Sequence, residues 1–180
     1  MAEFMTDGEV DWTTLALAVG SLEENGREHG SSIEAREAIS LIIGHNNLCA
    51  AVEHYVACRP GAELTRMVLW ALHPWCAMER CYEIYQQSDD LEARQEAVEL
   101  LRVVADHRAL PWAQGFLEDP DEGIQAWGAG MVDQLLFSHL VDPEDCVELL
   151  GLMAAHPNRL VRERCDFITE FLQARGESAS

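Results

Sequence analysis

Apolar residues recur with the period of an α-helix along almost the whole chain, and short segments rich in Gly, Pro, Asn and Asp interrupt them at regular intervals. Strand-like alternation is nearly absent, so the pattern predicts helices joined by short loops, with under about 5 % strand. Capping residues mark several starts, such as the capping box from Ser31 to Glu34 and the acid before a first-turn proline at Asp142. We expect ten helices, at residues 11–24, 32–44, 47–58, 62–73, 75–87, 91–105, 111–118, 122–138, 143–154 and 159–174.

The expected helices form pairs, and the pairs repeat along the chain. In five segments an apolar residue is followed three positions later by Arg or a bulky residue, with spacings of 31, 27, 33 and 37 residues. A period in this range with two helices per unit is typical of an α-solenoid. We interpret the recurring arginines as structural, each bonding carboxylates or carbonyls of neighbouring units. The five pairs are Ile33 and Arg36, Leu64 and Met67, Leu91 and Arg94, Ile124 and Trp127, and Val161 and Arg164.

The unit that begins at Asp90 resembles a HEAT-like repeat. Its first helix carries an acid, an apolar residue, Arg94, Ala97 and Leu100, and its short second helix ends in an Asp-Pro turn at Asp119. The resemblance covers residues 90–136 well and the segments on either side loosely. It implies an all-α fold, a HEAT-like α-solenoid of about five helical pairs. An irregular helical bundle is the alternative that short-loop helices also allow.

The length of 180 residues suits one domain with a real hydrophobic core. We expect a single α-helical repeat domain at residues 11–174, a disordered or cloning-derived start at residues 1–10, and a flexible C-terminus at residues 175–180. The start lacks the cationic and apolar regions of an export signal, and no apolar stretch reaches the ~18–20 residues that span a bilayer. These features predict a cytoplasmic protein with no membrane contact.

The charged residues exclude several classes of function. All 12 bases are Arg, so chemistry that needs a lysine, such as a P-loop or a Schiff base, is ruled out. The 32 acids give a net charge of −20, which argues against a protein that grips nucleic-acid phosphates. The same charge is suited to binding a basic protein.

Motifs for catalysis are missing from the sequence. Gly128 and Gly130 begin like a dinucleotide-binding fingerprint, but Asp133 stands where the last glycine belongs and no strand precedes them. These small residues are better explained as a place where two helices pack closely. No G-x-S-x-G, H-E-x-x-H or C-x-x-C motif occurs either, so we expect a protein that is not an enzyme.

The six cysteines are expected to be reduced thiols in the core rather than a disulfide framework. Two groups of cysteine and histidine residues contain possible metal ligands. Cys49, His54 and Cys58 cannot all face one ion from a single helix, and His73, Cys76 and Cys81 lack an evident fourth ligand. We therefore expect no metal and no cofactor.

The distribution of charge points to a candidate binding surface. Residues 109–158 hold nine acids and no base, and uncompensated like charge favours a partner of opposite sign. Trp112, after Pro111 at an expected helix start, is a possible apolar anchor, although a tryptophan packed between repeats is the simpler interpretation. The candidate partner-binding residues are Trp112, Glu118, Asp119, Asp121, Glu122, Glu144, Asp145 and Glu148.

A small, acidic, all-helical chain without catalytic motifs is similar in type to bacterial immunity proteins, which neutralise basic toxins and include helical-repeat scaffolds. This resemblance implies a non-catalytic, bacterial, toxin-inhibiting protein. An adaptor or regulatory HEAT-like scaffold is the alternative with the same physics. A HEAT-like DNA glycosylase is a further alternative, which the absence of bases from 109 to 158 disfavours.

Overall fold

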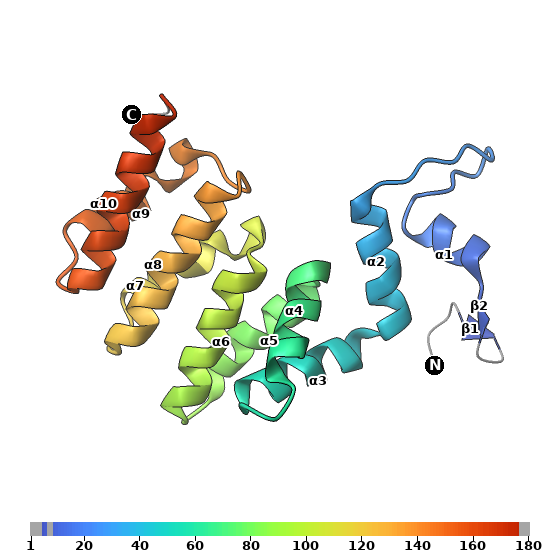
Figure 1. Ribbon diagram of the computed structural model, residues 1–180, viewed down its shortest axis with the longest axis horizontal. Coiled ribbons are helices and arrows are strands. Elements are labelled where there is room, and N and C mark those ends of the chain that lie inside the picture. The colour runs from blue at the N-terminus through green and yellow to red at the C-terminus, as the bar shows by residue number, and fades with distance from the viewer. Residues whose placement is uncertain (1–4, 7–8, 177–180) are drawn as a thin grey trace. The chain divides into compact units, whose positions relative to one another are not determined.

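The computed structural model describes residues 5–6 and 9–176, and its helices place the chain in the all-α class (Figure 1). The first unit contains α1 (Trp12–Ala18), α2 (Ser32–Ile43), α3 (His45–Val56) and α4 (Ala62–Leu72). Helix α5 (Trp75–Gln87) contains the boundary. The second unit continues with α6 (Leu91–Val104), η1 (His107–Trp112), α7 (Ala113–Leu117), α8 (Glu122–Phe137), η2 (Pro143–Cys146), α9 (Val147–Ala154) and α10 (Arg159–Ala174).

Contacts divide the chain into two compact units, Met1–Ala77 and Met78–Ser180. The expected single α-helical repeat domain at residues 11–174 stays a prediction. Two very short strands, β1 (Met5–Thr6) and β2 (Glu9–Val10), pair antiparallel within the segment expected to be disordered or cloning-derived. The rest of the expected flexible ends, residues 1–4, 7–8 and 177–180, lies outside the described residues.

Most expected helices agree with the structure to within two residues, because capping residues mark their starts. Ser31, Asp90 and Asp121 each accept a hydrogen bond from a backbone N–H of the first turn, at 3.1, 3.1 and 2.9 Å. The expectation for residues 11–24 was wrong beyond Ala18. There the chain turns at Gly20, which has a φ of +77°, a conformation that glycine adopts without steric cost.

In the first unit, α2, α3 and α4 pack on one another, and α3 supplies Leu48, Val52 and Tyr55 to the core. No residue of α2 is buried, and its Ile33 is 64 % exposed. Leu64 on α4 is exposed as well. These two members of the apolar repeat pattern therefore do not face the core of this unit.

Helix α8 is the centre of the second unit. It contacts α6 and α10 on either side and α7 behind, so that α6, α8 and α10 lie side by side (Figure 1). Its residues Ile124, Met131 and Leu135 are fully buried. Within the described residues, no helix is both long and apolar enough to cross a membrane.

The two small residues of α8 allow this close packing, as the sequence suggested. A Cβ atom added at Gly128 would lie 2.5 Å from the Cβ of Phe116 on α7. One added at Gly130 would lie 2.7 Å from Cδ of Arg102 on α6. Both distances are shorter than carbon atoms tolerate, so glycine is required at 128, where the opposing atom sits close to the backbone of α7.

The structural interpretation of the arginine column holds for two of its members. Arg94 donates from Nε to the Tyr85 carbonyl and from Nη2 to Asp119, and Arg164 donates to Asp133 at 2.9 Å. The apolar residues of the column are not equivalent, however. Ile124 and Val161 are buried, whereas Leu91, the first residue of α6, is 44 % exposed.

Replacing Gly128 by alanine should lower the free energy of unfolding by about 1–3 kcal/mol, since the methyl group overpacks the contact between α7 and α8. Gly151→Ala on α9 is the matched control, because nothing lies within 4 Å of an added Cβ there. That control should be neutral or stabilising by about 0.5–1 kcal/mol, the helix preference of alanine. Denaturant unfolding measures both. Equal stability of the two variants would contradict the packing described.

Candidate functional site

The acidic run at residues 109–158 is partly neutralised by cations from outside it. Asp119 is 5 % exposed and forms an ion pair with Arg94 of α6, and Asp133 forms one with Arg164 of α10. Burial raises the pKa of the Asp133 carboxyl, an effect that the Arg164 charge only partly offsets. The run holds no base of its own, but arginines outside it offset these two acids, because helices remote in sequence pack against α8.

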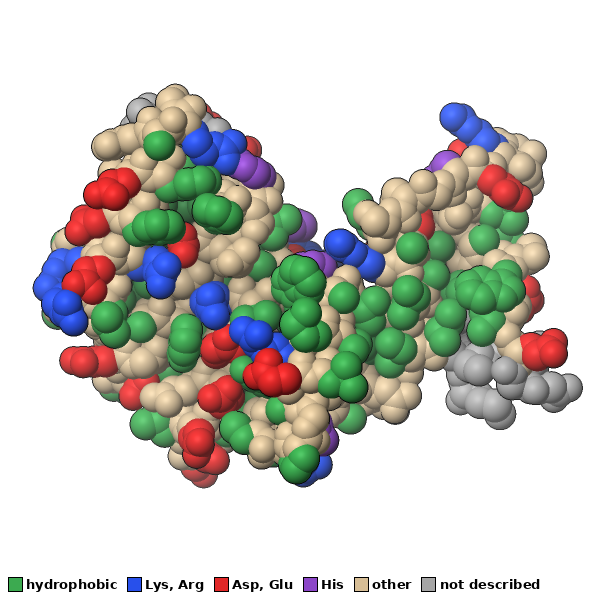
Figure 2. All heavy atoms as spheres, viewed as in Figure 1, with side chains coloured by type: hydrophobic (Ala, Val, Ile, Leu, Met, Phe, Trp, Pro, Cys, Tyr) green, Lys and Arg blue, Asp and Glu red, His purple; other side chains and the backbone are tan. Residues whose placement is uncertain are grey.

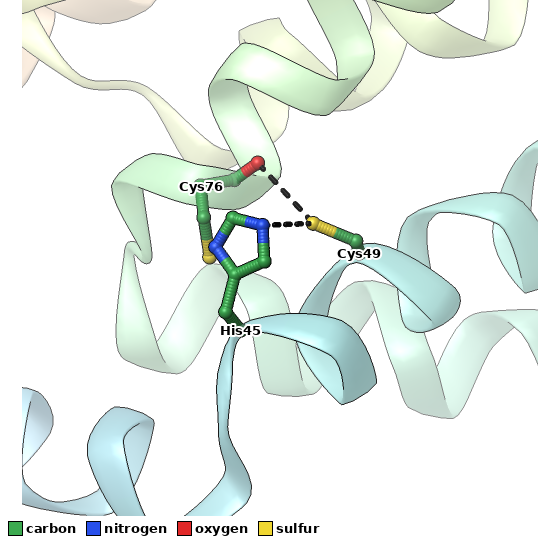
Figure 3. A group of neighbouring side chains, drawn as sticks. All are labelled: His45, Cys49 and Cys76. Atoms are coloured by element: carbon green, nitrogen blue, oxygen red, sulfur yellow. Dashed lines mark hydrogen bonds between the residues drawn. The ribbon is translucent and has the colours of Figure 1, made fainter.

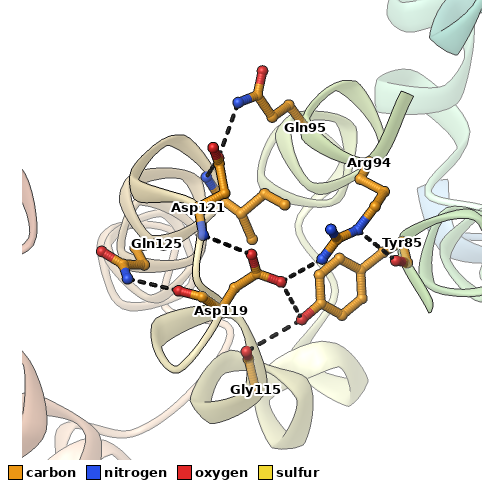
Figure 4. A network of polar contacts seen from close by, with 8 residues as sticks. Tyr85, Arg94, Gln95, Gly115, Asp119, Asp121 and Gln125 are labelled. Atoms are coloured by element: carbon orange, nitrogen blue, oxygen red, sulfur yellow. Dashed lines mark hydrogen bonds and ion pairs between the residues drawn. The ribbon is translucent and has the colours of Figure 1, made fainter. Parts of the chain in front are cut away.

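Asp119 is the centre of a polar network at the turn between α7 and α8 (Figure 4). Its Oδ2 accepts from Arg94 and lies 3.1 Å from the hydroxyl of Tyr85, which is also 3.2 Å from the Gly115 carbonyl. Its Oδ1 accepts from the backbone N–H of Asp121. Burial, together with the Asp119 charge, raises the pKa of Tyr85 to about 12. Asp119 thus stabilises the fold and is not an exposed contact residue.

Asp121 also has a structural role. Its Oδ1 accepts from Gln95 Nε2 of α6 at 2.9 Å and from the backbone N–H of Ile124 at the start of α8. The Gln95 hydrogen bond is the main reason that the pKa of the Asp121 carboxyl is lowered. Asp121 is half-buried, so a partner could reach only part of it.

The other five predicted carboxylates are exposed, and among the described residues none of them has an ion-pair partner. Glu118 accepts a hydrogen bond from Gln114 at 2.8 Å, and Glu122 lies in the first turn of α8. The other three occur together, Glu144 and Asp145 in η2 and Glu148 in the first turn of α9. Carboxylates are favoured at helix starts, but that preference leaves their charges available to a partner.

A hollow of about 340 Å³ opens beside η2. Three apolar side chains, one histidine and two carboxylates line it, namely Leu136, His139, Val141, Asp142, Pro143 and Glu144. His139 is held by a hydrogen bond from Arg175. Apolar side chains next to carboxylates match the long side chains of Arg and Lys, whose methylene groups pack on apolar surface while the charged end meets an acid.

Trp112 is less available than an interface anchor would be. Its indole is half-buried and stacks on the ring of Tyr82, with centroids 4.2 Å apart and planes inclined by 5°. One face of the ring is therefore used by the fold, as expected for a tryptophan packed between helices. Its role as an anchor stays a prediction.

A second hollow, of about 510 Å³, lies along α8 and α10 and carries both signs of charge. The Arg102 guanidinium is 5.0 Å from the centroid of the Trp127 ring, and the Arg164 guanidinium is 5.9 Å from that of Phe167. Glu163 completes the polar lining. Figure 2 shows acidic, basic and apolar side chains interspersed on the face of the second unit that it displays. The lining of this second hollow is less acidic than that of the hollow beside η2, because it contains two arginines and one glutamate.

The structure also brings together three side chains of types that can bind a metal, which lie apart in the sequence. His45, Cys49 and Cys76 of the first unit present donor atoms that all lie within 4.8 Å of one another (Figure 3). The pair His45 and Cys49 is visible in sequence as an i, i+4 spacing on one helix, but the approach of Cys76 from α5 is not.

The two groups weighed from the sequence do not come together in the described part of the chain. His54 Nε2 lies 3.0 Å from the Pro60 carbonyl, and Cys58 is an exposed residue just after α3. The expectation of core thiols is met by Cys81, Cys146 and Cys165, which are buried. All six cysteines lie among the described residues, and each is a thiol there.

Comparison of the chain with protein-family models, curated proteins and solved structures finds no match. A function for this chain is therefore inferred from the arrangement of the side chains described above.

Replacing Asp119 by asparagine should lower the free energy of unfolding by about 1.5–3 kcal/mol, because hydrogen bonds to a charged group are lost and Arg94 keeps a half-buried charge without its acid. Glu118→Gln is the matched control at the adjacent, exposed position and should stay within about 0.5 kcal/mol of the wild type. Denaturant titration followed by circular dichroism checks both values. A neutral Asp119→Asn variant would show that the network does not stabilise the fold.

Proposed function

We propose that this chain is a non-catalytic protein-binding module that captures and neutralises a basic partner protein, as an immunity protein does with its cognate bacterial toxin. The observation that carries the proposal is the exposed acidic group Glu144, Asp145 and Glu148 beside the hollow at η2. Among the described residues these carboxylates have no ion-pair partner, whereas Asp119 and Asp133 do. A cationic side chain from a partner would supply the missing charge.

An exposed acidic surface would affect both the rate at which a basic partner binds and the lifetime of the complex, and both effects suit an inhibitor that binds its target tightly. Carboxylates of one sign steer a basic partner toward the surface and raise the association rate. Those buried at the centre of an interface contribute to its lifetime as well, because their attraction to the cations of the partner must be broken before the two proteins separate. Neutralising a toxin inside the cytoplasm requires both a fast encounter and slow release.

The scaffold that we propose is a HEAT-like α-solenoid, and recurring contacts at the helix starts of the second unit support it. The N-caps of α6, α8 and α10 are Asp90, Asp121 and Asn158, with spacings of 31 and 37 residues. Each later cap bonds a glutamine of the helix before it, Asp121 with Gln95 and Asn158 with Gln125, both at 2.9 Å. A contact repeated between successive helices is typical of stacked repeats rather than of an irregular bundle.

Reversing the charges at Asp145 and Glu148 to arginine should weaken binding of the basic partner by at least about tenfold, because the cation then meets like charge. Reversal at Glu118 and Glu122 tests the neighbouring exposed pair. The partner is first identified by pull-down from the source cell and then purified, and its affinity is measured by calorimetry at about 50 mM and about 500 mM salt. Screening should weaken wild-type binding across that range.

Glu28→Arg with Glu37→Arg is the matched control, since both residues are exposed in the first unit and the change in net charge is the same. This variant should bind like the wild type. If it loses binding while both variants of the second unit keep it, the site lies in the first unit and the acidic surface is misassigned. If the purified chain turns over a small molecule or excises a base, the non-catalytic function is wrong.

A further inference from the structure

The three donors of the first unit come from two helices that meet at one point. His45 is the first residue of α3, and Cys49 follows one turn later on the same face. Cys76 lies in the first turn of α5. Figure 3 shows the three side chains turned toward one another, with Cys49 Sγ 3.6 Å from His45 Nε2 and 3.8 Å from the Cys76 carbonyl oxygen.

These distances match those between ligands of one tetrahedral ion. At the usual zinc bond lengths, a sulfur and a nitrogen ligand lie about 3.6 Å apart and two sulfur ligands about 3.8 Å apart. The distance from His45 Nε2 to Cys49 Sγ has that value, 3.6 Å. Cys76 Sγ is within 4.8 Å of both other donors, so it stands within about 1 Å of a bonding position.

The chemistry of the donors narrows the choice of metal. Thiolate and imidazole ligands suit zinc and copper, whereas magnesium and calcium need oxygen ligands. Two sulfurs and one nitrogen form a ligand set known for tetrahedral zinc, with water or a substrate in the fourth position. We propose that His45, Cys49 and Cys76 bind one zinc ion, with the fourth position open to solvent on the exposed His45 side.

Zinc binding would itself ionise the two thiols. Each cysteine that binds the ion does so as a thiolate and releases one proton to solvent, and the charge of the ion offsets the negative charge that forms on the sulfurs.

Such an ion would connect the start of α3 with the start of α5 through metal–ligand bonds. These bonds are stronger than the contacts that Cys49 Sγ makes with His45 and with the Cys76 carbonyl oxygen. None of its ligands is a residue of the acidic surface, since all three belong to the first unit. The two proposals therefore rest on different residues and can be tested with different variants.

The untagged full chain, kept reduced and free of oxygen, is titrated with Co²⁺ as a spectroscopic probe and then with Zn²⁺. Cobalt should give the intense d–d absorption of a tetrahedral site and a thiolate charge-transfer band, and one equivalent of zinc should abolish both. Elemental analysis after gel filtration should find one zinc per chain. A wild type that shows neither absorption nor bound zinc would overturn the proposal.

The variants Cys49→Ser, Cys76→Ser and His45→Ala should each weaken zinc binding by at least about tenfold, because each removes one of three ligands. The matched controls are Cys58→Ser, just after α3, and His54→Ala, on α3, which change the same residue types outside the cluster. Their zinc affinity should equal that of the wild type, with unchanged far-ultraviolet circular dichroism in all five variants. Equal loss in a control, or retained tetrahedral cobalt spectra in all three ligand variants, would place any metal elsewhere and reject this site.

Discussion

The close contact of α8 with α7 is the constraint on which the second unit depends. Gly128 lets the backbone of α8 approach the side chain of Phe116, and the helix then reaches α6 and α10 on its two sides. Once α8 is held there, its first turn and the preceding turn lie against α6, and Asp119 meets Arg94. The packing of small residues thus determines which charges become neighbours, since side chains follow the backbones that carry them.

This arrangement sorts the carboxylates of the acidic run into two kinds. Asp119, Asp121 and Asp133 face the neighbouring helices and are bound there by arginine or glutamine side chains. Glu144 and Glu148 are exposed and form no ion pair among the described residues. A carboxylate bound within the fold stabilises the protein, whereas one left in solvent contributes its field to the encounter with a partner.

The two proposed sites also differ in how they are built. The acidic surface is local in sequence, because η2 and the start of α9 follow one another directly. The donor cluster of the first unit is not, because Cys76 is 27 residues from Cys49 and arrives on another helix. A surface made of consecutive residues can be found from charge alone. A cluster of three side chains from two helices can be found only when it is known how the chain brings those helices together.

The sequence by itself determined the elements of this protein. Helical periodicity, N-cap residues such as Asp90 and Asp121, and the two glycines of α8 are local signals, and the structure follows them closely. Its one long error, the end of α1, came from a glycine whose left-handed conformation depends on the loop after it. Only the tertiary structure decided that Asp119 is buried, that Trp112 stacks on Tyr82, and that His45 joins two cysteines. Each depends on a residue from another helix, and the period of one helix carries no information about which neighbour will pack against it.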